Sequence, residues 1–225
     1  MEIQTYDNIQ IRVIQATSMP GTLVRLALDL TMKKYKPEGV LTDVSEKTLA
    51  FIMDADHTSV LEHIHFTFLI IGASRSFLAQ ITRHRVGSFT SASQHYQDYR
   101  EYPMVIHPDL YHNITMRTAL EISLDFYKSM IDKEGIEPQE ARQCLPNAAA
   151  INLLWSVNAR SLLNFFRQRL CHRNVDEMQI VARKIWTAVY HIWPEYAKLV
   201  GPPCYMDGSC NQGKMSCGRR FEHEI

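Results

Sequence analysis

The alternation of apolar and polar side chains in HIHFTFLII, residues 63–71, constrains the fold more than any other feature of the sequence. In an extended chain successive side chains point to opposite faces, so one apolar set faces a core. That set consists of Ile64, Phe66, Phe68 and Ile70. Ser74, a preferred N-cap residue, then begins a helical pattern that continues through Ile81. The stretch predicts a half-buried strand followed by a helix, with a basic triplet at the helix end: Arg83, His84 and Arg85.

The rest of the chain carries the patterns of several helices and few strands. A second strand is expected over 9–13, and the apolar stretch 148–157 is either a buried strand or a core segment. Helices are expected at 20–35, after Ser45, at 115–134, from Pro138 to Pro146, from Asn158 onwards, and at 175–200 with a break at Pro194. This predicts an α+β fold, predominantly helical, with a small mixed or antiparallel sheet whose strands come from distant parts of the chain. We expect one domain over 1–200 and a cysteine-containing tail over 201–225.

Charge and hydropathy exclude several classes of protein. The 225 residues include 24 Lys and Arg and 24 Asp and Glu, so no overall field draws the chain to nucleic acid or to an anionic membrane. The N-terminus lacks a signal-peptide pattern, and no apolar run approaches the ~18 residues of a membrane span. We therefore expect a cytoplasmic protein that binds neither nucleic acid nor membrane.

Two segments are rich in basic residues and lack acidic ones. The first runs from residue 83 to 97, and the second, from 141 to 175, contains Arg142, Arg160, Arg167, Arg169, His172 and Arg173. For the triplet alone, a solvated helix end that suits the helix dipole is the simple alternative. Two such segments in a neutral chain favour a ligand with several anionic groups, because guanidinium groups match phosphate oxygens with paired donors. One or two nucleotides fit this description.

The helix that begins at Asn158 carries polar groups on two sides. At helical spacing Arg160, Asn164 and Arg167 share one face, while Arg169 and Arg173 lie on roughly the opposite one. No G-x-G-x-x-G follows a strand and no G-x-x-x-x-G-K-[ST] occurs, so the Rossmann and P-loop classes are excluded. Side chains, not a glycine-rich loop, must hold the phosphates.

The arrangement Arg83-His84-Arg85, seven residues, then Ser93 resembles the R-H-R-x7-S signature of the flavin-dependent thymidylate synthases, which methylate dUMP with reduced FAD. EHIHFTF (62–68) is similar to the E-H-x-x-F-T-F strand of this family, and Gln80 precedes the signature at the expected place. VNARSLLNFFRQR (157–169) resembles the N-x-R-S-L-x-x-F helix. The resemblance covers about residues 9 to 200 and implies the fold of this family.

The resemblance also implies site residues and partners. The FAD-binding residues would be Ser59, Arg83, His84, Arg85, Asn158, Arg160 and Asn164. The nucleotide-binding residues would be Gln80, Ser93, Gln94, His95, Arg142 and Arg169. Arg169 is implied to be catalytic, because a fixed cation against a ring oxygen stabilises the negative charge that develops on the uracil. Methylenetetrahydrofolate would supply the carbon, NADPH the reducing equivalents, and a homotetramer would build each site from several chains.

Three departures from the family pattern concern the nucleotide. The usual S-x-R-Y is Ser93-Gln94-His95-Tyr96, the glutamate two residues before the serine is Ser91, and A-Q-W-E-I after Arg169 is NVDEM. Histidine carries a full charge only below its pKa of ~6.5, so a paired donor is lost at 95. The alternative is therefore one-carbon chemistry at carbon 5 of another pyrimidine nucleotide such as UMP. A distant alternative is a non-catalytic nucleotide-binding module.

Two further groups of residues have alternative interpretations. Ser93 as a nucleophile needs a base, for which only His84 and His95 are candidates, so we favour a hydroxyl that contacts substrate. The tail places Cys204, Cys210 and Cys217 where, with Cys171, they could ligate zinc, but C-x5-C-x6-C lacks the tight C-x2-C spacing. Free thiols in an ordered tail, and no metal, are the expectation.

Overall fold

The computed structural model describes residues 2–223, so residue 1 of the predicted domain and residues 224 and 225 of the predicted tail lie outside the described residues. A four-stranded antiparallel sheet lies at its centre, in the order β2 (Gln10–Ala16), β3 (His65–Ser74), β6 (Ala150–Asn158) and β4 (Ser88–Ser91). The strands thus come from distant parts of the chain, as predicted. The stretch 148–157 is mostly strand β6, which settles that alternative.

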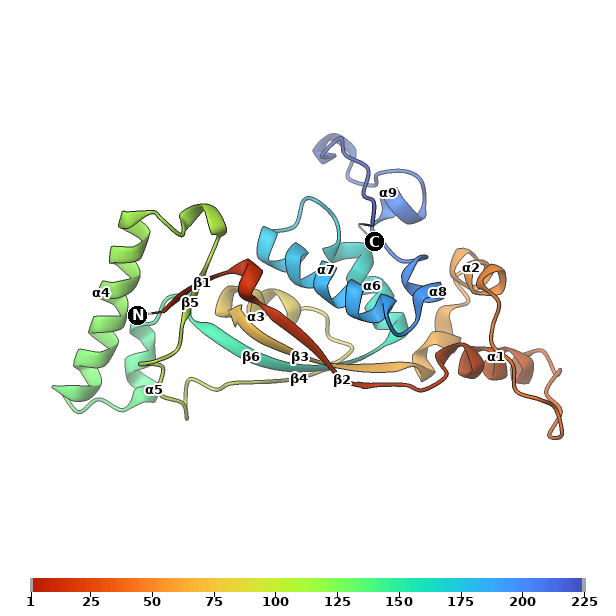
Figure 1. The fold of residues 1–225 in the computed structure, drawn as a ribbon, viewed down its shortest axis with the longest axis horizontal. Coiled ribbons are helices and arrows are strands. Elements are labelled where there is room, and N and C mark those ends of the chain that lie inside the picture. Colours follow the sequence, from red (N-terminus) through yellow and green to blue (C-terminus); the bar gives the residue numbers. More distant parts are fainter. Residues whose placement is uncertain (1, 224–225) are drawn as a thin grey trace.

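One face of the sheet is covered by helices. Figure 1 shows α3 (Arg75–Ile81), α6 (Ala159–Arg169) and α7 (Asp176–Tyr190) on the same side of it. The apolar side chains predicted to face the core from β3 point to this layer, because Phe66, Phe68 and Ile70 are each at most 1% exposed. Trp155 of β6 and Phe165 of α6 pack together in this core with ring centroids 5.0 Å apart. The sheet and α6 are thereby fixed relative to each other.

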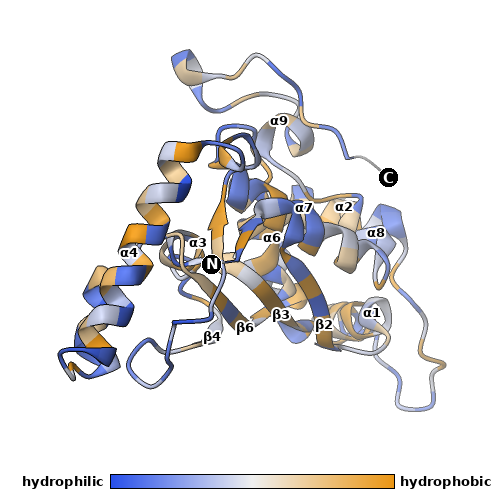
Figure 2. Ribbon diagram, turned by 60° about the vertical axis from the view of Figure 1, so that its left-hand side comes forward, coloured by the Kyte–Doolittle hydropathy of each residue, from blue (hydrophilic) through white to orange (hydrophobic). Residues whose placement is uncertain are grey.

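A second apolar cluster lies at one end of the molecule. There β1 (Ile3–Thr5) pairs in parallel with β5 (Met104–Ile106), beside α4 (Ile114–Asp132), α5 (Pro138–Ala141) and the 3-10 turns η3 (Pro108–Leu110) and η4 (Arg142–Cys144). Leu124 and Tyr127 of α4 are buried in this cluster. Figure 2 shows hydrophobic and hydrophilic segments alternating along α4, as in a helix with one buried and one exposed face. This end carries Arg142.

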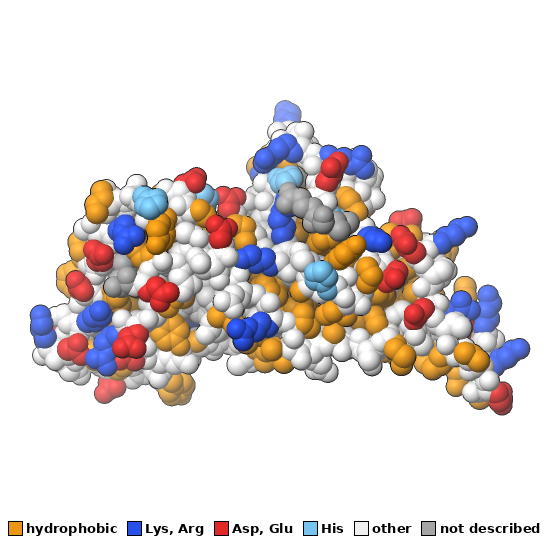
Figure 3. All heavy atoms as spheres, in the orientation of Figure 1, with side chains coloured by type: hydrophobic (Ala, Val, Ile, Leu, Met, Phe, Trp, Pro, Cys, Tyr) orange, Lys and Arg blue, Asp and Glu red, His pale blue; other side chains and the backbone are white. Residues whose placement is uncertain are grey.

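The other end holds α1 (Pro20–Thr31), α2 (Glu46–Asp54), η2 (Thr58–His63) and α8 (Pro194–Ala197), and short turns complete the chain: η1 (Tyr6–Asn8), α9 (Pro203–Met206) and η5 (Gly213–Met215). The tail packs on the main core, because Phe221 is buried there. The His223 ring stacks on Trp186 at 3.8 Å. Acidic and basic side chains are interspersed over both ends of the face in Figure 3. Among residues 2–223, no helix combines the length and apolar content needed to cross a membrane.

The predicted α+β class, helix-rich with a small sheet, is confirmed, but several boundaries are wrong. Helix α1 ends at Thr31 and not near Tyr35, because Lys33 adopts a left-handed φ of 57° and the chain turns back. Helix α7 ends at Tyr190, before the predicted break at Pro194, because the chain turns there and the N–H groups of Ile192 and Trp193 donate to the Val189 carbonyl. The sequence patterns did not predict β1, β5 or β4, the last of which lies within the first acid-free segment.

Candidate functional site

A cavity of about 430 Å³ lies between the start of α6 and the segment that follows α3. Ser74 caps α3 through its hydroxyl, but the helix ends at Ile81, so the basic triplet lies beyond the helix and not on its last turn. Asn158 caps α6, accepting from the Ser161 N–H at 2.8 Å, as predicted. The lining includes six of the predicted site residues: Arg83, His84, Arg85, Asn158, Arg160 and Asn164.

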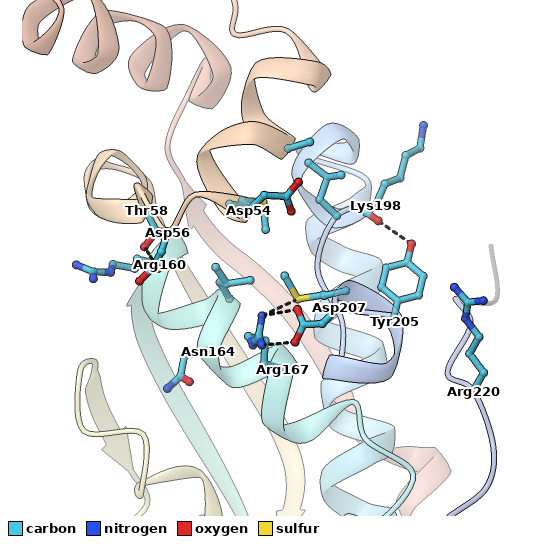
Figure 4. A pocket seen from close by; sticks show the side chains of 15 residues that line it. Asp54, Asp56, Thr58, Arg160, Asn164, Arg167, Lys198, Tyr205, Asp207 and Arg220 are labelled. Atoms are coloured by element: carbon cyan, nitrogen blue, oxygen red, sulfur yellow. Dashed lines mark hydrogen bonds and ion pairs between the residues drawn. The ribbon is translucent and has the colours of Figure 1, made fainter. Parts of the chain in front are cut away.

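A larger cavity of about 940 Å³ adjoins the first, because Arg160 and Asn164 line both. Arg167 also lines it, so the predicted shared face of α6 faces one space (Figure 4). The opposite wall comes from the tail, where Asp207 accepts from Arg167 at 2.8 and 3.3 Å. Arg173, by contrast, is not on the opposite face of α6, because the helix ends at Arg169.

Arg169 and His84 bring the two basic segments together within one chain. Arg169 Nε donates to His84 Nε2 at 2.9 Å, so the neutral His84 ring carries its proton on Nδ1. Arg169 also donates to Asn174 Oδ1 at 3.2 Å and to the Gln80 carbonyl at 3.4 Å. Burial, and next the charge of Arg169, lower the pKa of His84 to about 4. Burial, followed by the charge of Arg83, lowers the pKa of Arg169.

The arginines of this region differ in how their charge is compensated. Arg160 pairs with Glu62, and Arg167 pairs with Asp207. Among the ion pairs formed by residues 2–223, none includes Arg169, Arg83 or Arg85. Such cations can attract an anionic ligand without first breaking a salt bridge.

The remaining predicted residues lie elsewhere in the chain. Ser59 is exposed on η2, beside Thr58, which lines the larger cavity. Ser93, Gln94 and His95 follow β4, and Ser93 Oγ accepts from the backbone N–H of His95 at 3.2 Å. Arg142 is exposed on η4 beside α4 and lines neither cavity. A single chain therefore does not bring all the predicted nucleotide contacts to one place.

Sequence reasoning missed three polar residues of the site. Glu62 lines the smaller cavity and belongs to the EHIHFTF motif, but it lies outside both acid-free segments. Asp207 pairs with Arg167 from the tail, 40 positions away. Asn174, which contacts Arg169, showed only as a departure from the family pattern. The contacts of Glu62 and Asp207 link positions far apart in sequence, so helical spacing gives no signal for them.

The cysteines of the tail do not form a metal centre in this arrangement. Cys171, Cys204 and Cys210 line a third cavity of about 410 Å³ beside α6. Over the described range 2–223, no group of three or more His, Cys, Asp or Glu is arranged to hold a metal ion. All five cysteines are free thiols.

Comparison with known proteins identifies the family. The family described as Thymidylate synthase complementing protein matches residues 12–195. Flavin-dependent thymidylate synthases from Clostridium tetani and Geobacter sulfurreducens are 30% and 33% identical to this chain, covering 95% of it and 95% and 96% of their own lengths.

Two solved structures share the fold. The UMP/dUMP methylase PolB from Streptomyces cacaoi, bound with 5-Br dUMP, aligns with a TM-score of 0.75 at 20% identity over 88% of this chain and 96% of its own. Thymidylate synthase X from Helicobacter pylori, with FAD and dUMP, aligns at 0.68 and 21% over 85% and 97%. The chain is therefore an enzyme of the thymidylate synthase complementing protein family, as its sequence motifs predicted.

Proposed function

We propose that this enzyme methylates carbon 5 of dUMP to form dTMP, with FAD as cofactor, methylenetetrahydrofolate as carbon donor and NADPH as reductant. One observation carries the proposal: the Arg83–Arg85 segment and the end of α6 meet through the 2.9 Å hydrogen bond between Arg169 and His84. A flavin site and a nucleotide site built from these two segments would then adjoin. The names of the curated relatives and the ligands of the solved neighbours support this choice.

The residues around the two adjoining cavities fit FAD. A dinucleotide needs an extended space and cations for its pyrophosphate, and the cavities share Arg160 and Asn164 while Arg83 and Arg85 have no carboxylate partner among residues 2–223. We assign Ser59, Arg83, His84, Arg85, Asn158, Arg160 and Asn164 to FAD binding. FAD, when bound, supplies hydride transfer to the reaction.

Arg169 is the proposed catalytic residue. Its guanidinium is fixed by three neutral acceptors, so its positive charge remains available to an oxygen of the uracil ring. A fixed cation at that oxygen stabilises the ionised ring and raises electron density at carbon 5. We assign Gln80, Ser93, Gln94, His95 and Arg142 to nucleotide binding, with Ser93 as a contact and not a nucleophile, since no base among residues 2–223 accepts a hydrogen bond from its hydroxyl.

We infer that the complete site needs more than one copy of the chain. Arg142 and the segment 93–95 line neither of the two adjoining cavities, so a second chain would have to bring equivalent residues to the flavin-binding segments. A homotetramer with sites shared between subunits meets this need. Within each chain, we propose residues 1–200 as the catalytic domain and 201–225 as an accessory tail.

UMP is the second candidate substrate. The PolB neighbour is named a UMP/dUMP methylase, and this chain has His95 where the family pattern has an arginine. A weaker cation at this contact would relax the selection between nucleotides.

Flavin absorbance of the purified protein, followed by tritium release from carbon 5 of labelled dUMP and UMP, tests the proposal. We expect a yellow protein and release from dUMP that depends on methylenetetrahydrofolate; faster release from UMP would favour the second candidate. Arg169→Ala should nearly abolish release while flavin remains bound. Arg173→Ala is the matched control, because Arg173 contacts Gln212 of the tail instead. A colourless, inactive wild-type protein would refute both candidates.

A further inference from the structure

The turn that follows α6 is closed by the side chain of Asn174. Asn174 Nδ2 donates to the carbonyls of Gln168 and Cys171, the latter at 3.3 Å, and its Oδ1 accepts from Arg169 Nη1 at 3.2 Å. The orientation of the amide follows from its partners, since a guanidinium only donates and a carbonyl only accepts. One side chain therefore joins the end of the helix to the Arg169 guanidinium.

The contact holds Arg169 without neutralising it. Arg167, two residues earlier, is held by the Asp207 carboxylate, which compensates its charge. Arg169 is held by an amide oxygen, an imidazole nitrogen and a backbone carbonyl, all of them uncharged. Because Nη1 and Nε are fixed by different partners, both the position and the plane of the guanidinium are defined. The full positive charge remains for an anion that approaches it.

Position 174 is one at which this chain departs from the family pattern, which has alanine where NVDEM begins. Alanine has neither a side-chain acceptor for Nη1 nor a side-chain donor for the carbonyls of Gln168 and Cys171. The chain also lacks the family arginine at 95. With one cation fewer near the nucleotide, the placement of Arg169 carries more of the charge stabilisation.

We propose that Asn174 is a positioning residue for the reaction: it sets the orientation of Arg169 towards the uracil ring while leaving its charge uncompensated. This inference rests on the proposed function. Asn174 need not touch the nucleotide, because its effect passes through Arg169.

The test compares Asn174→Ala and Asn174→Asp with the wild-type holoenzyme. Asn174→Ala should lower kcat for dUMP about tenfold, corresponding to about 1.4 kcal/mol of barrier, with unchanged flavin content and KM. The rise of kcat with pH should move about one pH unit higher, because a misplaced cation favours the ionised uracil less. Asn174→Asp should lower kcat further, since a carboxylate at this position pairs with Arg169 and compensates its charge.

Asn113→Ala is the matched control for lost stability, because Asn113 caps α4 through a side-chain hydrogen bond at 2.9 Å and lies away from Arg169. It should lower the thermal midpoint about as much as Asn174→Ala while kcat and its pH profile stay at wild-type values. Wild-type kcat in Asn174→Ala, an unshifted pH profile, or full activity in Asn174→Asp would each overturn the inference. A wild-type enzyme that neither binds nor converts dUMP would instead refute the proposed function.

Discussion

Acid should destabilise this protein through His84 at a pH well above that at which most carboxylates titrate. Burial, and next the charge of Arg169, lower the pKa of His84 to about 4 in the folded chain, against 6.5 for an ordinary histidine. The unfolded chain therefore binds this proton first as the pH falls. The contribution of His84 to the free energy of unfolding is fully present above pH 6.5 and is lost progressively as the pH falls to about 4.

The magnitude follows from the gap between the two pKa values. At about 1.36 kcal/mol per pH unit, the gap sets an upper limit of about 3.4 kcal/mol. His84 keeps partial contact with water, however, and screening by solvent reduces the expected loss to about 1–2 kcal/mol. The loss includes the hydrogen bond from Arg169, because a protonated ring cannot accept at Nε2.

Urea denaturation after flavin removal, at several values between pH 7 and 4.5 and at one protein concentration, measures this loss. Over this range the free energy of unfolding of His84→Gln should fall by about 1–2 kcal/mol less than that of wild type, because glutamine offers Arg169 an acceptor that does not titrate. His95→Gln is the control at an exposed histidine. His223, whose pKa burial also lowers to about 4, is present in all three proteins and cancels in the comparison. Parallel stability curves for wild type and His84→Gln would refute the reasoning.

Three further predictions concern the scaffold around the site. Glu177→Ala should cost about 1–3 kcal/mol in urea denaturation, because Ser74 loses the partner of its N–H and hydroxyl, at 2.7 and 2.6 Å; a loss below about 0.5 kcal/mol would contradict this. Asp207→Asn should change global stability by less than about 1 kcal/mol yet speed proteolytic cleavage in the tail, since the pair with Arg167 is partly exposed; unchanged cleavage would argue against the pair as an anchor. Phe165→Ala should cost about 3–5 kcal/mol by calorimetry, because Phe165 is fully buried; a near-neutral result would mean that the core refills the space.

The elements that sequence reasoning found are those with a strong local signal. Strand β3 showed the two-residue period of a half-buried strand, and Ser74 and Asn158 are N-cap residues whose side chains accept the expected N–H bonds. Strand β4, SFTS, has neither a long apolar pattern nor a turn signal. It is a strand because β6 offers it a free edge, where Ser88 lies opposite Ser156. Such pairing depends on tertiary structure and not on local propensity.

The residues of the candidate site also divide into those with a local sequence signal and those without one. The basic triplet and the face of α6 that holds Arg160, Asn164 and Arg167 were found from motif and helical spacing. The acids that compensate two of these arginines were not, since Glu62 and Asp207 reach them across 98 and 40 positions. Arg142 differs from these residues, because it lines neither of the two cavities of its own chain. In the proposed homotetramer, another subunit would bring it to the site.

The pattern of compensated and uncompensated charge shows how a chain of zero net charge could hold the proposed anion site. Arg160 and Arg167 are balanced by carboxylates, so they fix the walls of the cavities and add little net field. Arg169, on the same helix, is held by uncharged groups and keeps its charge. If orientation alone mattered, a carboxylate would be the stronger anchor. Under the proposed function, the amide and the imidazole that hold Arg169 would fix its position while leaving its charge available to the nucleotide.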